Sequence, residues 1–254
     1  MSTENWLQLA GQSCLVAGAG GLGGTSALEL ARQGARVLLA DINPDSLSAM
    51  QHRATEIGLK IETIVADFRA PEACRELVAD ATAQLGRLDV FLHAVGRNIR
   101  QPILDLDDDA WAEIVNLNLS TAYWLGQAVG RVMCAQQSGR IVFVSSVSSW
   151  LAHPHHGPYA ATKGGLNQLM RVMAREWAID GVGVNAVAPG YVETELTRAY
   201  LETNGHREQL TSLVPAGRLG RPNEVADAVV FLASSRAQFI TGQVLYIDGG
   251  RTLV

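Results

Sequence analysis

A tyrosine and a lysine stand four residues apart near the start of a predicted helix, Tyr159 to Ile179. Side chains at this spacing project from one face of a helix, so the Tyr159 phenol and the Lys163 ammonium group lie together. A phenol has a reference pKa of about 10, and a nearby ammonium group favours phenolate, so we expect a lowered pKa for Tyr159. Ser146 comes thirteen residues earlier, at the end of a predicted strand, where its hydroxyl could hold a substrate oxygen. Taken alone, these residues also fit an ordinary amphipathic helix.

Five glycines occur in the seven residues Gly18 to Gly24, between an apolar run and a helical pattern. This order of strand, glycine-rich turn and helix is typical of a dinucleotide site, where backbone amides at the helix start donate to pyrophosphate. A tight turn with positive φ is the alternative, but such a turn does not require so many glycines. The predicted phosphate-binding residues are Gly18, Gly20, Gly21, Leu22 and Gly23.

An aspartate ends the second predicted strand, eighteen residues after Gly23. At this place the Asp41 carboxylate can accept hydrogen bonds from the adenosine ribose hydroxyls, and it would repel a 2′-phosphate. No Arg or Lys occurs in the glycine-rich turn or at Ile42 and Asn43, so the sequence favours NAD over NADP. Asp41 could instead cap the helix that begins at Pro44.

Asp67 closes the third predicted strand in the same way and could reach the adenine edge. Simple turn chemistry explains Asp67 equally well. Ile42 and Phe68, which follow the two aspartates, are included among the predicted cofactor contacts.

Short apolar runs rich in Val, Ile and Leu alternate with helical patterns along the chain. This alternation predicts an α/β fold of the Rossmann type, in which right-handed crossovers give a doubly wound parallel sheet with helices on both faces. Ligands then bind at the carboxyl ends of the strands. No linker or repeat interrupts the pattern, so we expect a single domain over residues 1–254. The predicted strands are Ser13 to Ala17, Ala35 to Ala40, Ile61 to Ala66, Leu88 to His93, Arg140 to Ser145, Val182 to Ala188 and Gln243 to Ile247.

Two polar segments stand outside this rhythm. The acidic run Asp105 to Asp109 is predicted to be the start of a helix, where carboxylates cap free amides, rather than a metal site. The segment Arg198 to Leu213 is predicted to be a substrate lid, within a substrate-side region of about residues 190–220.

Basic side chains occur in the loops that would border a substrate. His153, His155 and His156 lie in a proline-containing loop without a carboxylate, so a polar pocket wall is favoured over a zinc site, and no metal is expected. Arg97 and Arg100 could pair with a substrate carboxylate or phosphate, although solvated loop arginines are equally expected.

The composition excludes several classes of protein. Of 254 residues, 48% are apolar and 18% charged, and the formal net charge is −5 without any basic tract. Disorder, nucleic-acid binding and binding to anionic membranes are therefore not expected. Three cysteines without CxxC spacing indicate neither a disulfide framework nor a zinc knuckle. Because no leader-like or membrane-spanning apolar stretch occurs, we expect a cytoplasmic protein.

In combination, these residues resemble the short-chain dehydrogenase/reductase family over nearly the whole chain. The resemblance implies the strand order 3-2-1-4-5-6-7, a homotetramer, and a catalytic tetrad of Asn118, Ser146, Tyr159 and Lys163. The motifs that carry it, in the family's order and spacing, are Asn118-Leu119, Ser146, Tyr159-Ala-Ala-Thr-Lys163, Val184-Asn185, Pro189-Gly190 and Asp248-Gly249-Gly250.

The resemblance also implies a role for each residue. Ser146 orients the substrate hydroxyl, Tyr159 as phenolate takes its proton, and hydride leaves the carbon for nicotinamide C4. Lys163 bonds the nicotinamide ribose, and Asn118 holds a water molecule that passes the proton to solvent. For the residues after the sixth strand, the alternative to cofactor binding is an ordinary strand-end turn and a helix cap. The further cofactor contacts implied are Ala94, Gly96, Pro189, Gly190, Val192 and Thr194, beside Tyr159 and Lys163.

The sequence departs from the family pattern at two places. The glycine-rich loop is one residue shorter than usual and begins with Ala17 in place of Thr, so the glycine that meets each phosphate stays open. His93-Ala94-Val95-Gly96 stands where Asn-Asn-Ala-Gly is usual, so we expect packing to replace the side-chain hydrogen bonds that brace this strand.

The segment Ala188 to Thr197, with the two loop arginines, resembles polyol and sugar-acid dehydrogenases of the gluconate 5-dehydrogenase type. The expected function is NAD-dependent interconversion of a secondary alcohol and a ketone on a small polar substrate. A 3-oxoacyl carrier-protein reductase is the alternative, but such enzymes usually prefer NADP and dock an acidic carrier through basic residues. A non-catalytic dinucleotide sensor would need the glycine loop but not Tyr159 with Lys163.

Overall fold

The computed structural model describes residues 6–254, apart from the side chains of residues 195 and 196. Residues 1–5 lie outside the described residues, so the structure does not bear on the prediction that no leader-like stretch occurs there. The centre is one parallel sheet of seven strands in the order β3-β2-β1-β4-β5-β6-β7, which confirms the predicted fold class and strand order. The strands are β1 (Ser13–Ala17), β2 (Arg36–Asp41), β3 (Glu62–Val65), β4 (Val90–His93), β5 (Gly139–Val144), β6 (Val182–Pro189) and β7 (Val244–Ile247).

The observed strands match the predicted runs to within two residues at either end. The largest difference is at β4, which was predicted from Leu88 but begins at Val90. The side chain of Gln136 bonds both backbone groups of Leu88, with 3.1 Å from the Leu88 amide to Oε1 and 2.7 Å from Nε2 to the Leu88 carbonyl. The backbone hydrogen bonds of Leu88 are therefore made with a side chain instead of with a neighbouring strand.

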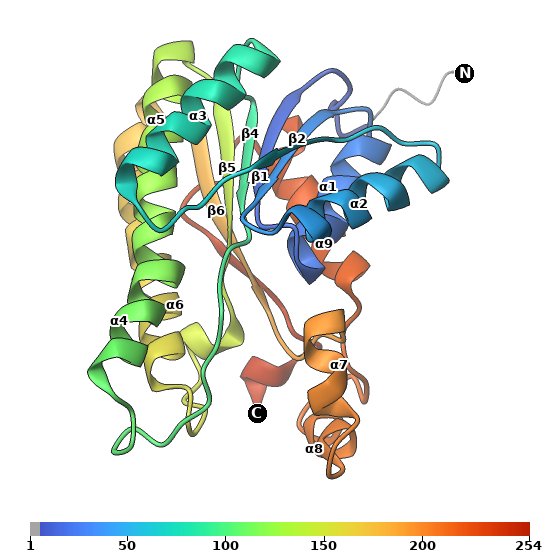
Figure 1. Cartoon of the computed structure of the whole chain (residues 1–254), viewed down its shortest axis with the longest axis vertical. Helices are drawn as coiled ribbons and strands as arrows, with labels where there is room; N and C mark the ends of the chain where they lie inside the picture. The colour runs from blue at the N-terminus through green and yellow to red at the C-terminus, as the bar shows by residue number, and fades with distance from the viewer. Residues whose placement is uncertain (1–5) are drawn as a thin grey trace.

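Helices cover both faces of the sheet (Figure 1). One layer contains α1 (Gly21–Arg32), α2 (Pro44–Glu56) and α9 (Pro222–Ala233), and the other contains α3 (Pro71–Leu85), α5 (Thr121–Gln136) and α6 (Gly157–Trp177). Each layer encloses its own apolar core, because all strands except the outermost are buried on both faces. The two cores hold the strands, and with them the strand ends, in fixed positions.

In the layer that contains α3, α5 and α6, a π-helical turn interrupts the longest helical run. The acidic run begins α4 (Asp108–Val115) as predicted, with Asp107 Oδ1 accepting from the Ala110 amide at 2.7 Å. The helix does not end at Val115. α4 continues through a π-helix, Asn116–Ser120, directly into α5. The wider turn changes the angular position of each following side chain, and such bulges are frequent at functional sites.

Several short elements lie at the carboxyl edge of the sheet. The predicted lid segment contains two short helices, α7 (Glu195–Leu201) and α8 (His206–Ser212), and its mobility stays a prediction. Figure 1 shows α7, α8, the start of α4 and the C terminus at one end of the molecule, beyond the end of β6. The chain closes with a 3₁₀ turn, Arg251–Leu253. The ligand-binding edge of the fold is thus surrounded by segments from both halves of the chain.

Candidate active site

The four residues of the predicted tetrad come together at the carboxyl ends of β4 and β5. Ser146 follows β5, Asn118 stands in the π-helix, and Tyr159 and Lys163 occupy the first turns of α6. Gly96 lies between two of them, since a Cβ built there would be 3.3 Å from Asn118 Oδ1 and 3.4 Å from Lys163 Nζ. The structure therefore brings the four side chains to the same end of the sheet, and their catalytic roles stay a prediction.

Lys163 is almost fully buried, with 3% of its surface exposed. Its ammonium group donates to the Val144 carbonyl at the end of β5, over 2.7 Å. Burial disfavours the charged form and lowers the pKa of Lys163 to about 8. The hydrogen bond to Val144 fixes the ammonium group in place, and with this pKa the group is still mostly protonated at pH 7.

Tyr159 is partly buried, and its ring centroid lies 5.6 Å from Lys163 Nζ. Burial raises the pKa of the Tyr159 phenol, while the hydrogen-bonding Ser146 side chain and the charge of Arg100 act in the opposite direction. The expected lowering of this pKa by Lys163 is therefore wrong in direction, because desolvation outweighs the charges that reach the phenol.

Asn118 is fully buried and bonds the backbone of the loop that follows β4. Its Oδ1 accepts from the Arg97 amide at 2.8 Å, and its Nδ2 donates to the Arg97 carbonyl at 2.8 Å and to Thr162 Oγ1 at 3.3 Å. The π-helical turn thus directs Asn118 to tie the β4 loop to α6. Ser146, 8% exposed, accepts from the Ser148 amide at 3.1 Å and so starts a 3₁₀ turn at the end of β5.

The glycine-rich turn has no space for side chains at Gly18, Gly23 and Gly24. A Cβ on Gly23 would lie 2.0 Å from the Gly18 carbonyl oxygen, and one on Gly18, where φ is +101°, would lie 3.0 Å from Ala94. Gly20, in contrast, has open space around it and precedes α1, whose start has no side-chain cap. A pyrophosphate group fits here, because the amides at the helix start have no side-chain cap and no side chain covers the backbone of Gly20.

Asp41 holds the backbone on both sides of the predicted ribose position. Its Oδ2 accepts from the Ala19 amide at 2.7 Å and its Oδ1 accepts from the Asn43 amide at 2.9 Å. The alternative that Asp41 caps α2 is wrong, because Asn43 Oδ1 accepts from the Asp45 amide and is the cap. Ile42 beside it is 49% exposed.

Asp67 is engaged locally in the manner of a turn residue. Arg69 binds its carboxylate with 2.6 Å from Nη2 to Oδ2, and this hydrogen bond lowers the pKa of Asp67. The Phe68 side chain is 5% exposed and packs into the core. Any contact of Phe68 with a cofactor would therefore involve its backbone.

The predicted cofactor contacts that follow β6 lie beside the glycine-rich turn. A Cβ on Gly21 would be 3.3 Å from the Thr194 side chain, so these segments meet across the site. Thr194 caps α7 by accepting from the Thr197 amide at 3.2 Å. Pro189 ends β6, and Val192 forms a bridge with Gly220. Thr194 therefore has the capping role that was its alternative, at a place where it also borders the nucleotide site.

The two loop arginines have different partners. Arg97 pairs with Glu113 over 2.6 Å in an exposed ion pair, so its charge is already balanced. Arg100 donates from Nε to His156 Nε2 at 3.1 Å, and its guanidinium lies 3.9 Å above the centre of the Tyr200 ring. Arg100 forms no ion pair with any described side chain, and its charge reaches Tyr159.

Two of the three histidines form the polar wall that the sequence predicts. His153 bonds Ser148 Oγ at 3.0 Å and the Tyr191 hydroxyl at 3.1 Å, and its ring centroid is 5.5 Å from that of His156. His155 is exposed and does not belong to this wall. Sequence reasoning missed Tyr191, because its contact with His153 joins positions 38 residues apart. No group of three or more His, Cys, Asp or Glu side chains with metal-binding geometry occurs in the described part of the chain.

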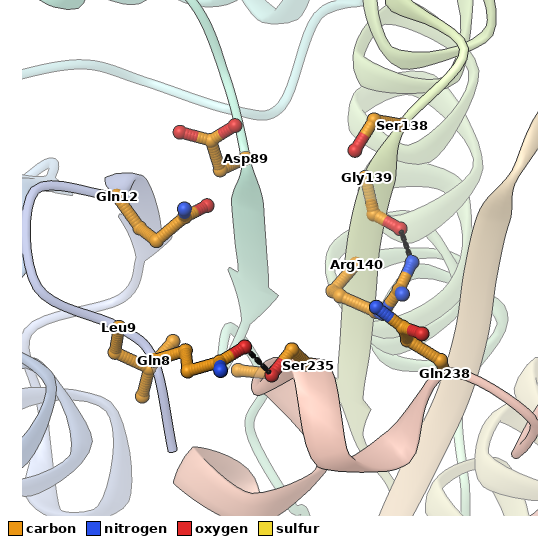
Figure 2. A pocket seen from close by; sticks show the side chains of 10 residues that line it. Gln8, Leu9, Gln12, Asp89, Ser138, Gly139, Arg140, Ser235 and Gln238 are labelled. Atoms are coloured by element: carbon orange, nitrogen blue, oxygen red, sulfur yellow. Dashed lines mark hydrogen bonds between the residues drawn. The ribbon is translucent and has the colours of Figure 1, made fainter. Parts of the chain in front are cut away.

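A separate polar cavity of about 160 Å³ opens at the amino-terminal edge of the sheet, opposite the candidate site. Figure 2 shows Asp89, Gln12 and Arg140 around it, with Arg140 turned toward the Gly139 carbonyl. None of the predicted site residues lines this cavity. Among the described residues no helix is long and apolar enough to cross a membrane.

Comparisons with known proteins agree with this geometry. Residues 16–252 match the family model described as enoyl-(acyl carrier protein) reductase. Gluconate 5-dehydrogenase of Gluconobacter oxydans is 37% identical over 254 residues, which is 100% of this chain and 99% of the relative. The 3-oxoacyl-[acyl-carrier-protein] reductase of Thermotoga maritima is 34% identical, covering 96% of this chain and 99% of that one. The crystal structure of a gluconate 5-dehydrogenase from Burkholderia cenocepacia, in complex with NADP and tartrate, is 34% identical with a TM-score of 0.93, covering 98% of both chains.

The chain belongs to the short-chain dehydrogenase/reductase family. Its members are NAD(P)-dependent oxidoreductases that act on alcohol and ketone groups of small molecules, which confirms the class of enzyme predicted from the sequence.

Proposed function

We propose that this protein is an NAD-dependent oxidoreductase that interconverts a secondary alcohol and a ketone on a small polar substrate, such as a polyol or sugar acid. The observation that carries the proposal is the convergence of Ser146, Tyr159 and Lys163 beside the uncapped glycine-rich turn. A dinucleotide sensor would not need a buried lysine next to a phenol. The geometry supports this assignment of the catalytic residues.

The residues divide the proton chemistry among them. Ser146 holds the substrate oxygen. The Tyr159 phenolate takes the proton of that oxygen during alcohol oxidation, and the Tyr159 phenol returns it during ketone reduction. The raised pKa of the Tyr159 phenol favours its protonated form, which suits donation of a proton during ketone reduction. NAD, when bound, supplies the acceptor for the hydride that leaves the substrate carbon. Lys163 would hold the nicotinamide ribose, and Asn118 would hold a water molecule that connects the proton path to solvent.

The preference for NAD over NADP rests on Asp41. Its carboxylate lies at the end of β2 and holds the Ala19 amide of the glycine-rich turn, so a 2′-phosphate would meet a negative charge. No basic side chain occurs between Gly18 and Gly24 to balance that charge. The Burkholderia cenocepacia relative was crystallised with NADP, so the preference has to be measured for this chain.

A 3-oxoacyl carrier-protein reductase is the second candidate, and the Thermotoga maritima relative favours it. An acidic carrier protein needs a basic surface for docking, whereas this chain has a net charge of −5 and neutralises Arg97 with Glu113. Arg100 has no described ion-pair partner; it is exposed beside His156, and its charge reaches Tyr159. This placement favours a small acidic or polyhydroxylated substrate.

The test is NADH formation across polyols, sugar acids and 3-hydroxyacyl thioesters, with NAD and NADP in parallel. We expect turnover with NAD on polyols or sugar acids, abolished by Tyr159→Phe. Turnover confined to the thioesters with NADP would favour the reductase, and tight NADH binding without turnover would favour the sensor.

The quaternary state and location are further parts of the proposal. Tyr123 on α5 and Val172 on α6 leave 43% and 44% of their surfaces exposed, which supports a homotetramer that covers these helices. Sedimentation of the purified protein tests this directly, and a monomer would contradict it. We place the enzyme in the cytoplasm, with no nucleic acid or membrane as a partner, which cell fractionation checks.

A further inference from the structure

The last residue of β4 is a histidine whose side chain is fully buried. The ring of His93 packs against Phe91 and Phe143, whose ring centroids lie 6.4 and 5.8 Å away. It also makes a hydrogen bond, because Nε2 lies 3.0 Å from Thr121 Oγ1. The expectation that packing replaces the side-chain hydrogen bonds at this strand end is therefore wrong for His93.

The partner of His93, Thr121, holds the π-helical turn of residues 116–120. In an α-helix the Thr121 amide would bond the Leu117 carbonyl, but here it bonds the Asn116 carbonyl. The Thr121 hydroxyl donates to the Leu117 carbonyl instead, over 2.6 Å. The side chain thus bonds the carbonyl group from which its own amide has moved away.

The direction of the hydrogen bond between His93 and Thr121 follows from this contact. A carbonyl oxygen can only accept, so the single hydrogen of the Thr121 hydroxyl points to Leu117. Thr121 Oγ1 then offers His93 only lone pairs, and the imidazole proton belongs on Nε2. Burial, followed by the charge of Lys163, lowers the pKa of His93 to about 3, so the ring is neutral and Nδ1 carries no proton.

The other nitrogen of this neutral ring has no partner. Among the described residues, His93 Nδ1 is one of the buried side-chain atoms without a hydrogen bond. A buried acceptor without a partner costs free energy, whereas a leucine would fill the space between the two phenylalanine rings without that cost. Packing alone therefore does not explain a histidine at this position, but a role of the Nε2 donor does.

Hydrogen bonds join the π-helical turn to β4 at two points. In the site, Asn118 bonds the amide and the carbonyl of Arg97, both at 2.8 Å, in the loop that follows the strand. In the core, His93 at the end of the strand bonds Thr121, three residues after Asn118. One contact would leave the turn free to rotate about it, whereas two contacts fix both its position and its rotation.

The rotation of the turn matters because Asn118 and Lys163 approach the same glycine. A Cβ on Gly96 would lie 3.3 Å from Asn118 Oδ1 and 3.4 Å from Lys163 Nζ, so a small rotation would change the distance between these two groups. We infer that His93 is a positioning residue of the proposed active site, which, through Thr121, fixes the π-helical turn with Asn118 beside Lys163. This inference rests on the proposed function.

Two amide side chains at position 93 separate the donor from the packing. The amide nitrogen of glutamine takes the place of histidine Nε2, whereas that of the shorter asparagine takes the place of Nδ1 and does not reach Thr121. We expect His93→Asn to lower kcat about 10- to 100-fold and to change NADH affinity less than about threefold, because the turn moves while the glycine-rich turn does not. His93→Gln should retain kcat to within about threefold of the wild type.

Thr121→Val removes the hydroxyl that links His93 to the turn. We expect it to lower kcat at least as much as His93→Asn, and the double variant to be no slower than Thr121→Val, because the two residues act through one contact. The matched control is Thr82→Val near the end of α3, where the hydroxyl donates to the Val78 carbonyl at 2.6 Å. This control removes the same kind of bond and should leave kcat unchanged.

Hydrogen–deuterium exchange on the full-length protein gives a second readout that does not require turnover. The peptide that covers residues 116–121 should exchange faster in His93→Asn and Thr121→Val than in the wild type, and at the wild-type rate in His93→Gln. The peptide that covers α1 should exchange equally in all of these proteins.

Equal kcat values for His93→Asn and His93→Gln would overturn the inference, whether both variants are fast or both are slow. Unchanged exchange over residues 116–121 in His93→Asn would also overturn it. Absence of Tyr159-dependent turnover in the wild type would instead contradict the proposed function. The exchange rates of the asparagine and glutamine variants would then decide by themselves whether His93 positions the turn.

Discussion

The nucleotide side and the substrate side of the carboxyl edge are built from different kinds of contact. On the nucleotide side, backbone meets backbone at Gly18 and Gly23, and Asp41 holds the Ala19 amide across 22 positions of sequence. On the substrate side, long side chains meet one another instead, as Arg100 and His156 do across 56 positions. The first arrangement requires small residues at defined places, whereas the second depends on which charged and aromatic side chains the loops happen to carry.

This difference separates what the family shares from what one enzyme recognises. A pyrophosphate is the same group in every dinucleotide, so a backbone cradle suffices for it. A substrate is recognised by its own functional groups, and these require side chains with unused donors. Substitutions on the nucleotide side should therefore act on cofactor binding and folding, and those on the substrate side on selectivity. The tetrad lies between the two sides, and substitutions there should act on the rate of turnover.

The largest expected effect is at the junction of the two sides. Tyr159→Phe removes the hydroxyl that moves the proton, so we expect kcat to fall about 10²- to 10⁴-fold with little change in NADH affinity. Steady-state NADH absorbance and fluorescence titration measure the two quantities. Tyr123→Phe, an exposed tyrosine on α5, is the matched control. A variant with full activity would show that another group transfers the proton.

Next in size is the glycine packing of the nucleotide side. In Gly23→Ala the new Cβ would lie 2.0 Å from the Gly18 carbonyl oxygen, so the turn must shift, and we expect a loss of about 2–3 kcal/mol in the free energy of unfolding. Urea denaturation measures it.

Gly20→Ala is the internal comparison for this turn, because its Cβ would meet nothing within 4 Å. We expect it to fold with unchanged stability. If it also lost NADH affinity, the phosphate would lie against Gly20. Equal stability of the two variants would contradict the packing argument.

A smaller effect is expected for the choice of cofactor. Asp41→Asn removes the charge but keeps one amide oxygen that can accept from Ala19 or Asn43, so the turn is retained. We expect the ratio of kcat/KM for NAD to that for NADP to fall about tenfold, the equivalent of about 1.4 kcal/mol. An unchanged ratio would show that Asp41 acts only on the turn.

The sequence predicted the nucleotide side more fully than the substrate side, and the physical reason is separation along the chain. The strands and the glycine-rich turn are local patterns of apolar spacing and residue type. The π-helical turn that directs Asn118 adds a residue to one helical turn, which periodicity over a short segment does not reveal. The pairing of Arg97 with Glu113 depends on a tertiary contact between distant segments, so the sequence left Arg97 and Arg100 equivalent.

The smallest expected effect is a pH dependence that belongs to the substrate side. The pKa of His156 is lowered to about 4, so between pH 6.5 and 4 the unfolded chain binds a proton that the folded chain does not. Its contribution to stability is therefore complete above about pH 6.5 and is lost as the pH falls toward 4. Because the ring is only half-buried, we expect solvent screening to reduce this contribution to about 1–2 kcal/mol.

His156→Gln keeps an oxygen that can accept from Arg100 but removes the titration. Between pH 7 and pH 4 the wild-type unfolding temperature should fall by about 2–4 °C more than that of the variant, as differential scanning fluorimetry would measure. His52→Gln, the same change on the exposed face of α2, should follow the wild type. Identical pH profiles for wild type and His156→Gln would mean that His156 is solvated in both states, and Arg100 would then lose the neutral acceptor that holds its guanidinium beside Tyr159.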